Sequence, residues 1–342
     1  MRERAPVPPD AAGEEALAAL PVRVLSATTG GGVVRRELAC RVAPDVELFC
    51  RYAAPDPVPH PAGDGAASTR VWLLHGAGMD SLGFDVPVPG WSLMGRLARR
   101  GHEVLACDYR GHGRSSRVPD GTQVNLPVVR DDTVAAIRLL DQWSGRGRGT
   151  GSDATGRGSA VHLVGISFGS ILAPLVAREL GEGAASLTLL GAIFARLGTL
   201  EAETIASLPQ LATAPGGYAF TTEEEWGDQF LAAASPEVLR WHEVTYGTAY
   251  AYPVGPYLSL ARLPFDPDLS AVRCPTRVVI GDRDPLASTA DVHRLFAALG
   301  SADTQLVVQE GVGHLPYVEA QAAAVVDVID DVIRAAAPVP GQ

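Results

Sequence analysis

A serine stands between two glycines in the pentapeptide Gly165-Ile166-Ser167-Phe168-Gly169. Strand-forming residues (AVHLVG) precede this serine and a helical pattern (SFGSILAPLVARELG) follows it, so we expect a sharp strand-to-helix turn here. Such a turn would lift the Ser167 hydroxyl clear of the backbone, where it could attack a carbonyl carbon. It would also crowd the two flanking positions, which must then be small. The pattern is weak by itself, and its place between the two elements gives it weight.

A serine hydroxyl needs a base to take its proton and a carboxylate to orient that base. Two aspartates, Asp282 and Asp284, follow the predicted strand TRVVIG, and His314 follows the next predicted strand. Among the eight histidines, His242 and His314 are the two at suitable places outside a strand or helix core. His314 lies on a short loop framed by glycine and proline. Because open α/β sheets bind ligands at the carboxyl ends of their strands, we expect Ser167, an aspartate and His314 to meet there.

The segment His75-Gly76-Ala77-Gly78 ends another apolar run, RVWLL. Small residues let main-chain amides approach a developing negative charge. We expect the N–H groups of Phe168 and Ala77 to form an oxyanion hole, with the N–H of Gly78 as the alternative donor. His75 is expected to be a structural hydrogen-bonding residue, and a plain glycine turn would also explain the segment.

The elements that must position these groups alternate between strands and helices, which predicts a mostly parallel sheet with crossover helices. Two antiparallel strands, RRELACRV and VELFCRYA, come first. The alternation stops over 197–263, where helical patterns but no convincing strand occur, and then resumes. The prediction is an α/β core over 34–196 and 264–338, a helical insertion over 197–263 and a loose leader over 1–33. The glycine-rich tract within 144–159 is expected to be a surface loop.

The motifs HGAG, DYRGHGRSS, GISFG, GDRDP and GVGH, in this order, resemble those of the α/β-hydrolase superfamily over roughly residues 35–336. The resemblance implies an α/β-hydrolase fold whose helical insertion forms a cap over the active site. It implies Ser167 as the nucleophile, His314 as the general base and an aspartate that orients the base. Asp284 is preferred to Asp282 because the family usually shows G-x-x-D at this place. The chain order of serine, aspartate and histidine is also that of the family.

This resemblance implies a serine hydrolase, similar to esterases and lipases, that cleaves an ester, thioester or lactone. Ser167 stands where haloalkane dehalogenases and epoxide hydrolases of this fold carry aspartate, which disfavours those activities. The same residues could serve acyl transfer, carbon–carbon bond hydrolysis, or a lyase or cyclase step in specialised metabolism. A non-catalytic ligand receptor is the third hypothesis. Asp108, Arg110 and His112 are interpreted as scaffold, and no metal or organic cofactor is expected.

Aromatic residues gather in the predicted cap. Trp226, Trp241, Tyr246 and Tyr250 are the candidates for contacts with a bulky apolar or aromatic substrate. A small cap could equally use these rings to build its own core, and the sequence does not choose between the two hypotheses.

The chain has 342 residues and a formal net charge of −11. Its length suits one large α/β domain with an insertion, or two modest domains. Its acidity argues against a nucleic-acid partner, and no apolar segment is long enough to span a membrane. Glu14, Glu15 and Arg23 interrupt any apolar run near the start, so no secretory signal is expected. We therefore expect a cytoplasmic protein that acts on a small molecule, with a homodimer as an option.

The four cysteines do not have the spacing of a metal site. Cys40 and Cys50 flank a turn and could face each other across a hairpin, but a bond between them is not expected in a reducing compartment. Cys107 and Cys274 are expected to be small core residues.

Overall fold

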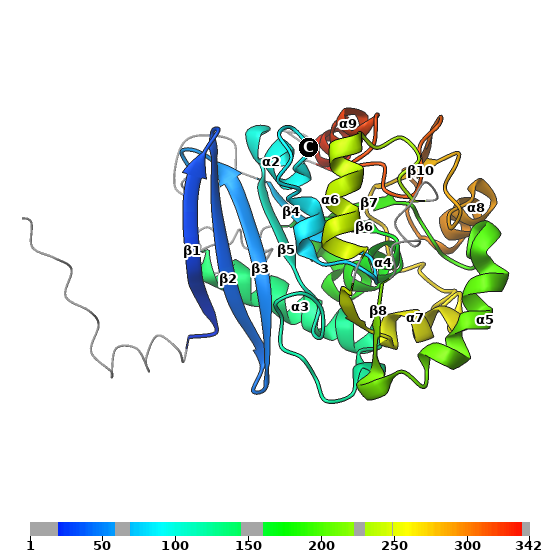
Figure 1. Cartoon of the computed structure of the whole chain (residues 1–342). Coiled ribbons are helices and arrows are strands. Elements are labelled where there is room, and N and C mark those ends of the chain that lie inside the picture. The colour runs from blue at the N-terminus through cyan, green and yellow to red at the C-terminus, as the bar shows by residue number, and fades with distance from the viewer. Residues whose placement is uncertain (1–19, 59–68, 145–159, 222–229, 248, 337–342) are drawn as a thin grey trace, which may run out of the picture.

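The computed structural model describes residues 20–58, 69–144, 160–221, 230–247 and 249–336 of the chain. In this part of the chain a large sheet runs through the molecule (Figure 1). Its strands are β1 (Val22–Gly30), β2 (Val33–Ala43), β3 (Val46–Pro55), β4 (Arg70–Leu74), β5 (Glu103–Cys107), β6 (Val161–Ile166), β7 (Ala184–Leu190), β10 (Thr276–Gly281) and β11 (Thr304–Gln309).

The strand order in the described sheet is β1-β2-β3-β5-β4-β6-β7-β10-β11. All pairings from β5 to β11 are parallel. The pairings of β1 with β2, β2 with β3 and β3 with β5 are antiparallel. The mostly parallel sheet and the antiparallel pair at its start are as predicted, so the α/β fold class is confirmed.

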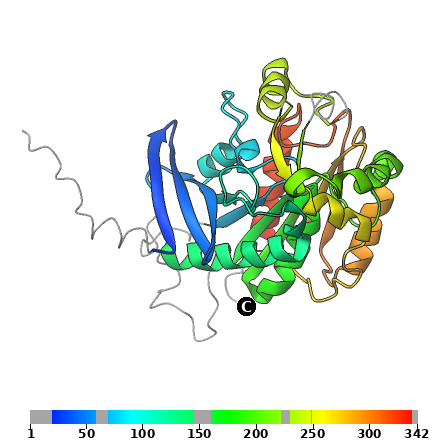
Figure 2. The ribbon, with the colours of Figure 1, turned by 60° about the horizontal axis from the view of Figure 1, so that its bottom comes forward.

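Helices cover both faces of the sheet (Figure 2). They are α2 (Leu93–Arg99), α3 (Leu126–Trp143), α4 (Phe168–Leu180), α8 (Thr289–Ala298) and α9 (Ala322–Ala336). Side chains of α3, α4 and α8 belong to one apolar cluster, and those of α2 and α9 belong to a second. Because both faces are covered, the central strands β4, β5 and β6 are buried at every position. This double burial explains why they read as continuous apolar runs.

Residues 197–263, which we call the insert, interrupt the alternation between β7 and β10. The insert contains α5 (Glu201–Leu211), α6 (Pro236–Tyr246), α7 (Gly255–Ser259) and a small antiparallel sheet of β8 (Tyr218–Phe220) and β9 (Ala251–Pro253). Its helices were predicted, but the expectation that it holds no strand is wrong. Strands of three residues are at the lower limit of length and give almost no pattern in a sequence. In both views α5 and α7 lie far from β1 (Figures 1 and 2).

Strand β1 corrects the expectation of a loose leader over 1–33. Val22–Gly30 pairs along its whole length with β2 and forms one edge of the sheet. Most of its side chains are exposed on both faces, and the pairing shifts register between Val24 and Ser26. An exposed, irregular edge strand lacks the alternation that marks a half-buried strand. Residues 1–19 lie outside the described part of the chain.

A disulfide joins Cys50 of β3 to Cys107 of β5, which face each other in the antiparallel pairing of these strands. Cys107 is buried in the core as expected, but its bond to Cys50 was not predicted. Cys40 pairs across β2 and β3 with Leu48 rather than Cys50, so the hairpin bond is absent. Cys40 and Cys274 are free thiols, and burial raises the pKa of Cys40 to about 12 and that of Cys274 to about 11.

None of the helices in the described ranges is long and apolar enough to cross a membrane. The tract expected to be a surface loop, 144–159, lies outside the described residues except for Ser144.

Candidate active site

Ser167 occupies the turn between β6 and α4 with φ 54° and ψ −119°. Among the described residues, Ala249 is the one other non-glycine residue with positive φ. Such a conformation costs about 1–3 kcal/mol and persists where the surroundings impose it. One anchor is the Ser167 N–H, which donates to the carbonyl of Leu190 at 3.1 Å. The strand-to-helix turn is therefore present as predicted.

Both glycines of the pentapeptide lie where no side chain fits. A Cβ on Gly165 would approach the carbonyl oxygen of Gly169 to less than 3.0 Å. A Cβ on Gly169 would do the same to the carbonyl oxygen of Leu74, the last residue of β4. Because the obstructing atoms are backbone, they have little freedom to move aside. This confirms that crowding at the turn, rather than a flexible loop, explains the two glycines.

Asp284 and His314 follow β10 and β11 and form a buried pair. The imidazole Nδ1 lies 2.9 and 2.8 Å from the two carboxylate oxygens of Asp284. The same carboxylate accepts the N–H groups of Leu286 and Ala287 at 2.8 and 3.0 Å. A proton on Nδ1 completes this network and leaves Nε2 as an acceptor. His314 Nε2 is buried and has no hydrogen-bond partner among the described residues.

The alternative carboxylate, Asp282, has a different role. It is exposed, and its Oδ1 accepts the N–H of Gly311 at 2.7 Å in the turn after β11. Of the two candidates, the structure thus brings Asp284 to the histidine. His242, the other histidine considered as a base, is buried in α6 with its Nδ1 at 2.9 Å from the carbonyl of Val238.

The exit of β7 joins the serine to the histidine. Leu190 accepts the N–H of Ser167, and the next residue, Gly191, lies under the imidazole. A Cβ on Gly191 would lie 2.8 Å from Nδ1 and 2.9 Å from Cε1 of His314. The backbone of Ser167 and the imidazole of His314 therefore contact two consecutive residues, Leu190 and Gly191, at the end of β7. His314 Nε2 makes no hydrogen bond to the Ser167 hydroxyl.

The segment after β4 passes over the serine. A Cβ on Gly76 would lie 3.4 Å from the Cβ of Ser167. Ala77 and Phe168 are buried, and Gly78 is partly exposed. Phe168 is the first residue of α4, where N–H groups have no partner within the helix. The segment His75–Gly78 and the start of α4 thus both lie beside Ser167.

The family model described as "Alpha/beta hydrolase family" matches residues 73–328, which is most of the chain and includes every residue of this site. The chain belongs to the α/β hydrolase family. A search of the curated proteins gave no match.

Solved structures with the same fold come from several α/β hydrolases. A thermophilic esterase from Thermogutta terrifontis is 20% identical with a TM-score of 0.60, covering 92% of this chain and 98% of its own. The enol-lactonase from Burkholderia xenovorans LB400 is 17% identical with a TM-score of 0.60, covering 86% and 98%. The 2-hydroxy-6-oxo-6-phenylhexa-2,4-dienoate hydrolase from Rhodococcus sp. strain RHA1 is 18% identical with a TM-score of 0.56, covering 86% and 96%. At these identities the likeness establishes the fold.

In this α/β hydrolase the loop after β5 braces the segment over the serine. The Tyr109 N–H donates to His75 Nε2 at 3.1 Å, and the Tyr109 hydroxyl donates to the His75 carbonyl at 3.0 Å. His112 Nε2 lies 2.9 Å from the carbonyl of Ala77. Burial lowers the pKa of His75 well below its ordinary value and that of His112 to about 4, so both are neutral. Both histidines are structural, as predicted, and so is Arg110, which pairs with Asp132.

Two buried carboxylates, Asp80 and Asp108, lie beside this loop. A Cβ on Gly113 would meet oxygens of both, so they face the same space. The Tyr246 hydroxyl of α6 donates to Asp80 at 2.9 Å, which ties the insert to the core. Burial and the neighbouring Asp80 raise the pKa of Asp108 to about 7. The Asp108 carboxyl therefore keeps a proton over much of the acidic range.

Asp108 predicts a pH-dependent stability. Its carboxyl is protonated below about pH 7 in the folded chain, whereas an aspartate in the unfolded chain is protonated only below about pH 4. The folded state thus binds more protons between these values, and the free energy of unfolding falls as pH rises through them. Between pH 4 and pH 8 the free energy of unfolding of wild type should fall by up to about 4 kcal/mol more than that of Asp108→Asn. Urea denaturation at several pH values measures this slope.

The asparagine variant also keeps only one of the two side-chain oxygens that accept the N–H groups of Ser81 and Arg114, which costs stability at every pH. The readout is therefore the change in the free energy of unfolding with pH, not its value at any one pH. Parallel plots of unfolding free energy against pH for the two proteins would contradict the raised pKa of Asp108.

Three of the four aromatic candidates hold the insert together. Tyr246 is fully buried against Asp80, and the Tyr250 hydroxyl accepts the N–H of Gly113 at 3.3 Å. The ring of Trp241 lies edge-on to Tyr246 at 5.8 Å. These contacts favour the hypothesis that the rings build the insert and its junction with the core. The fourth candidate, Trp226, lies outside the described residues.

Sequence reasoning did not select two residues that the fold brings to this site. Tyr257 of α7 places its hydroxyl 2.9 Å from where a Cβ on Gly78 would be. Glu319 lies five residues beyond His314 and bonds to the loop that carries it.

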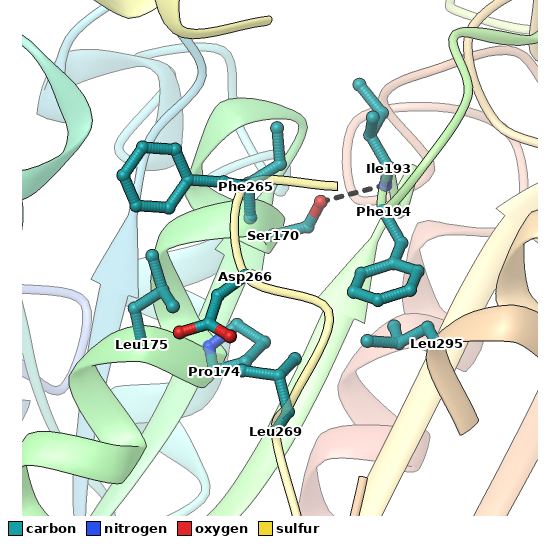
Figure 3. A pocket seen from close by; sticks show the side chains of 10 residues that line it. Ser170, Pro174, Leu175, Ile193, Phe194, Phe265, Asp266, Leu269 and Leu295 are labelled. Carbon is teal, nitrogen blue, oxygen red and sulfur yellow. Dashed lines mark hydrogen bonds between the residues drawn. The ribbon is translucent and has the colours of Figure 1, made fainter. Parts of the chain in front are cut away.

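A small cavity opens beside α4 (Figure 3). Its lining includes Ser170, Ile193, Phe265, Leu269 and Leu295. The Ser170 hydroxyl accepts the N–H of Ile193 at 3.1 Å. At about 10 Å³ the cavity has room for roughly one water molecule. It therefore does not serve as a substrate pocket.

Proposed function

We propose that this α/β hydrolase is a serine hydrolase that cleaves an ester, thioester or lactone of a small apolar or aromatic substrate. The observation that supports this most is the buried Asp284–His314 pair on the strand exit that also anchors Ser167. A serine held in a strained turn next to an imidazole with an unpartnered nitrogen has the parts of an activated nucleophile.

In the proposed reaction the Ser167 hydroxyl attacks the carbonyl carbon, and His314 Nε2 takes its proton. Asp284 holds the imidazole in the tautomer that can accept this proton and stabilises the imidazolium that forms. The negative charge on the carbonyl oxygen is stabilised by the N–H groups of Phe168 and Ala77, with Gly78 as the alternative donor.

Collapse of the tetrahedral intermediate breaks the bond to the alcohol or thiol, which takes the proton from His314. Water then attacks the acyl-enzyme, and His314 takes a proton from this water and returns one to the Ser167 oxygen. The acid is released and the enzyme is restored. In this proposal the insert is the cap that shields the site from water.

Acyl transfer and carbon–carbon bond hydrolysis remain the alternative proposals, since the same residues can serve both. The esterase and the lactonase among the similar structures support acyl chemistry, and the phenylhexadienoate hydrolase supports the second alternative. A receptor without catalysis is disfavoured because an intact set of serine, histidine and aspartate is present.

The test is turnover of p-nitrophenyl esters of rising chain length in ¹⁸O-labelled water. We expect a carboxylic acid that contains one solvent oxygen, and modification of Ser167 by a fluorophosphonate that peptide mass spectrometry locates. Product without solvent oxygen would favour acyl transfer. Folded protein that neither turns over any ester nor reacts with the probe would contradict the proposal.

A further inference from the structure

Glu319 is a fully buried carboxylate that bonds to backbone on both sides of His314. Its Oε2 accepts the N–H of Gly313 at 2.8 Å, and its Oε1 accepts the N–H of Leu315 at 3.2 Å. Oε2 also accepts the N–H of Ala233 in the insert at 2.7 Å. One side chain thus fixes the peptide groups before and after the histidine.

The insert contacts this loop through further backbone bonds. The His314 N–H donates to the carbonyl of Phe230 at 2.9 Å, and the Ala320 N–H donates to the carbonyl of Ala233 at 3.0 Å. The Phe230 ring meets the imidazole edge-on at 5.6 Å. Residues 230–234 and the histidine loop are therefore docked to each other, and Glu319 is the side chain that joins them.

Burying a carboxylate is unfavourable unless hydrogen bonds or charges offset the loss of water. Burial raises the pKa of Glu319, while its three amide hydrogen bonds and the nearby His314 act in the opposite direction. Three N–H donors around one carboxyl favour the anionic form, since a protonated carboxyl would place a fourth donor among them. The negative charge attracts His314 most strongly when the imidazole is protonated.

We propose that Glu319 is a positioning residue for the general base. Its carboxylate holds the loop that carries His314, docks residues 230–234 of the insert against that loop, and stabilises the imidazolium formed when His314 takes the serine proton. This inference rests on the proposed function, in which His314 is the base.

The other charged groups around the imidazole are few in the described residues. Asp284 faces Nδ1 from the loop after β10, and Asp282 and Arg283 on that loop are exposed. The exit of β7 and residues 230–234 carry no titratable side chain. Tyr317, on the histidine's own loop, is buried against Phe84. In the part of the chain that the structure describes, Glu319 and Asp284 are thus the two carboxylates that act on the imidazole.

The test is Glu319→Gln, which keeps the size of the side chain and removes its charge. Its amide can accept hydrogen bonds only through one oxygen, so the three N–H groups lose part of their support. We expect kcat to fall by about 10- to 100-fold, as for other partners that orient a catalytic group, with KM changed much less. The acid limb of the kcat/KM profile should move to lower pH, because a charge that favours the imidazolium is gone.

A second readout does not require turnover. The Cε1–H signal of His314, assigned by its loss in His314→Ala, reports protonation of the imidazole by NMR. Its midpoint in Glu319→Gln should also move to lower pH, so a failed ester assay and a failed coupling are distinguishable.

Asp330→Asn is the matched control. Asp330 is a buried carboxylate of α9 that bonds to His102 before β5, at the end of the sheet opposite the site. Its loss should lower stability without moving the midpoint of His314. An equal shift in this control, or an unchanged kcat and midpoint in folded Glu319→Gln, would overturn the proposal.

If Glu319→Gln does not fold, Glu319→Asp keeps the charge and shortens the reach. We then expect a midpoint near that of wild type with a lower kcat. Wild-type kcat in this variant would equally overturn the positioning role.

Discussion

Replacing Ser167 by alanine will lower kcat for ester hydrolysis by about 10⁴-fold or more and leave the chain folded. The proposed mechanism has no substitute for the hydroxyl, because no acyl-enzyme forms without it. The Ser167 side chain makes no capping hydrogen bond to α4, and the strained turn is imposed by its neighbours. Thermal denaturation should therefore give a Tm close to that of wild type, and fluorophosphonate labelling should disappear.

Ser170→Ala is the matched control for this variant. Ser170 lies three residues further along α4 and is buried, with its hydroxyl hydrogen-bonded to the Ser167 carbonyl and the Ile193 N–H. Its removal should cost about 1–3 kcal/mol of stability and leave labelling of Ser167 intact. Equal ester turnover by wild type and Ser167→Ala would end the nucleophile assignment.

Ser167→Gly separates strain from chemistry. Glycine adopts a φ of 54° without the cost that a side chain incurs. This variant should be as inactive as the alanine variant, and more stable than it when both are unfolded in urea.

Replacing Gly169 by alanine will destabilise the protein by about 3 kcal/mol or more. The added Cβ would press on the Leu74 carbonyl, which ends a strand in the middle of the sheet and cannot retreat from the helix. Relief requires β4 and α4 to separate, and this movement would widen the space between the start of α4 and the segment over the serine. We therefore expect ester turnover to fall together with the free energy of unfolding.

Gly183→Ala is the matched control for the glycine. It lies just after α4, has an ordinary backbone conformation, and a Cβ there would be 3.7 Å from the nearest atom, on Leu180. This substitution should change the free energy of unfolding by less than about 1 kcal/mol. A Gly169→Ala protein as stable as Gly183→Ala would contradict the crowding argument.

The turn that carries Ser167 was predictable because every part of its signal is local. A buried strand, a serine between glycines and a helical pattern are adjacent in the chain. A side chain at Gly165 would collide with the backbone of the same turn, and one at Gly169 would collide with the end of the adjacent strand β4. The choice of Asp284 over Asp282 was different. Both follow the same strand two residues apart, and family resemblance alone decided it; the structure supplies the reason, since Asp282 bonds to the turn at Gly311.

Features that depend on distant pairing left little trace in the sequence. The β1 sequence VRVLSATTG has neither alternation nor burial, and its conformation comes from β2 alongside it. Glu319 bonds to backbone amides, which have no side-chain signature. The one available sign was a carboxylate within the apolar stretch HLPYVEAQAAAV, a setting where a charge needs a partner.

The covalent link between β3 and β5 bears on the choice of host for producing this protein. Cys50 and Cys107 are 57 residues apart, and the ring they close contains β4 and the segment that passes over Ser167. Cross-linking a ring of this length disfavours the unfolded chain by about 4 kcal/mol in the chain-entropy description. Glutathione keeps thiols reduced in most cytosols. Protein secreted by one host would therefore carry the disulfide and have a free energy of unfolding about 4 kcal/mol higher than reduced protein extracted from the cytosol of another.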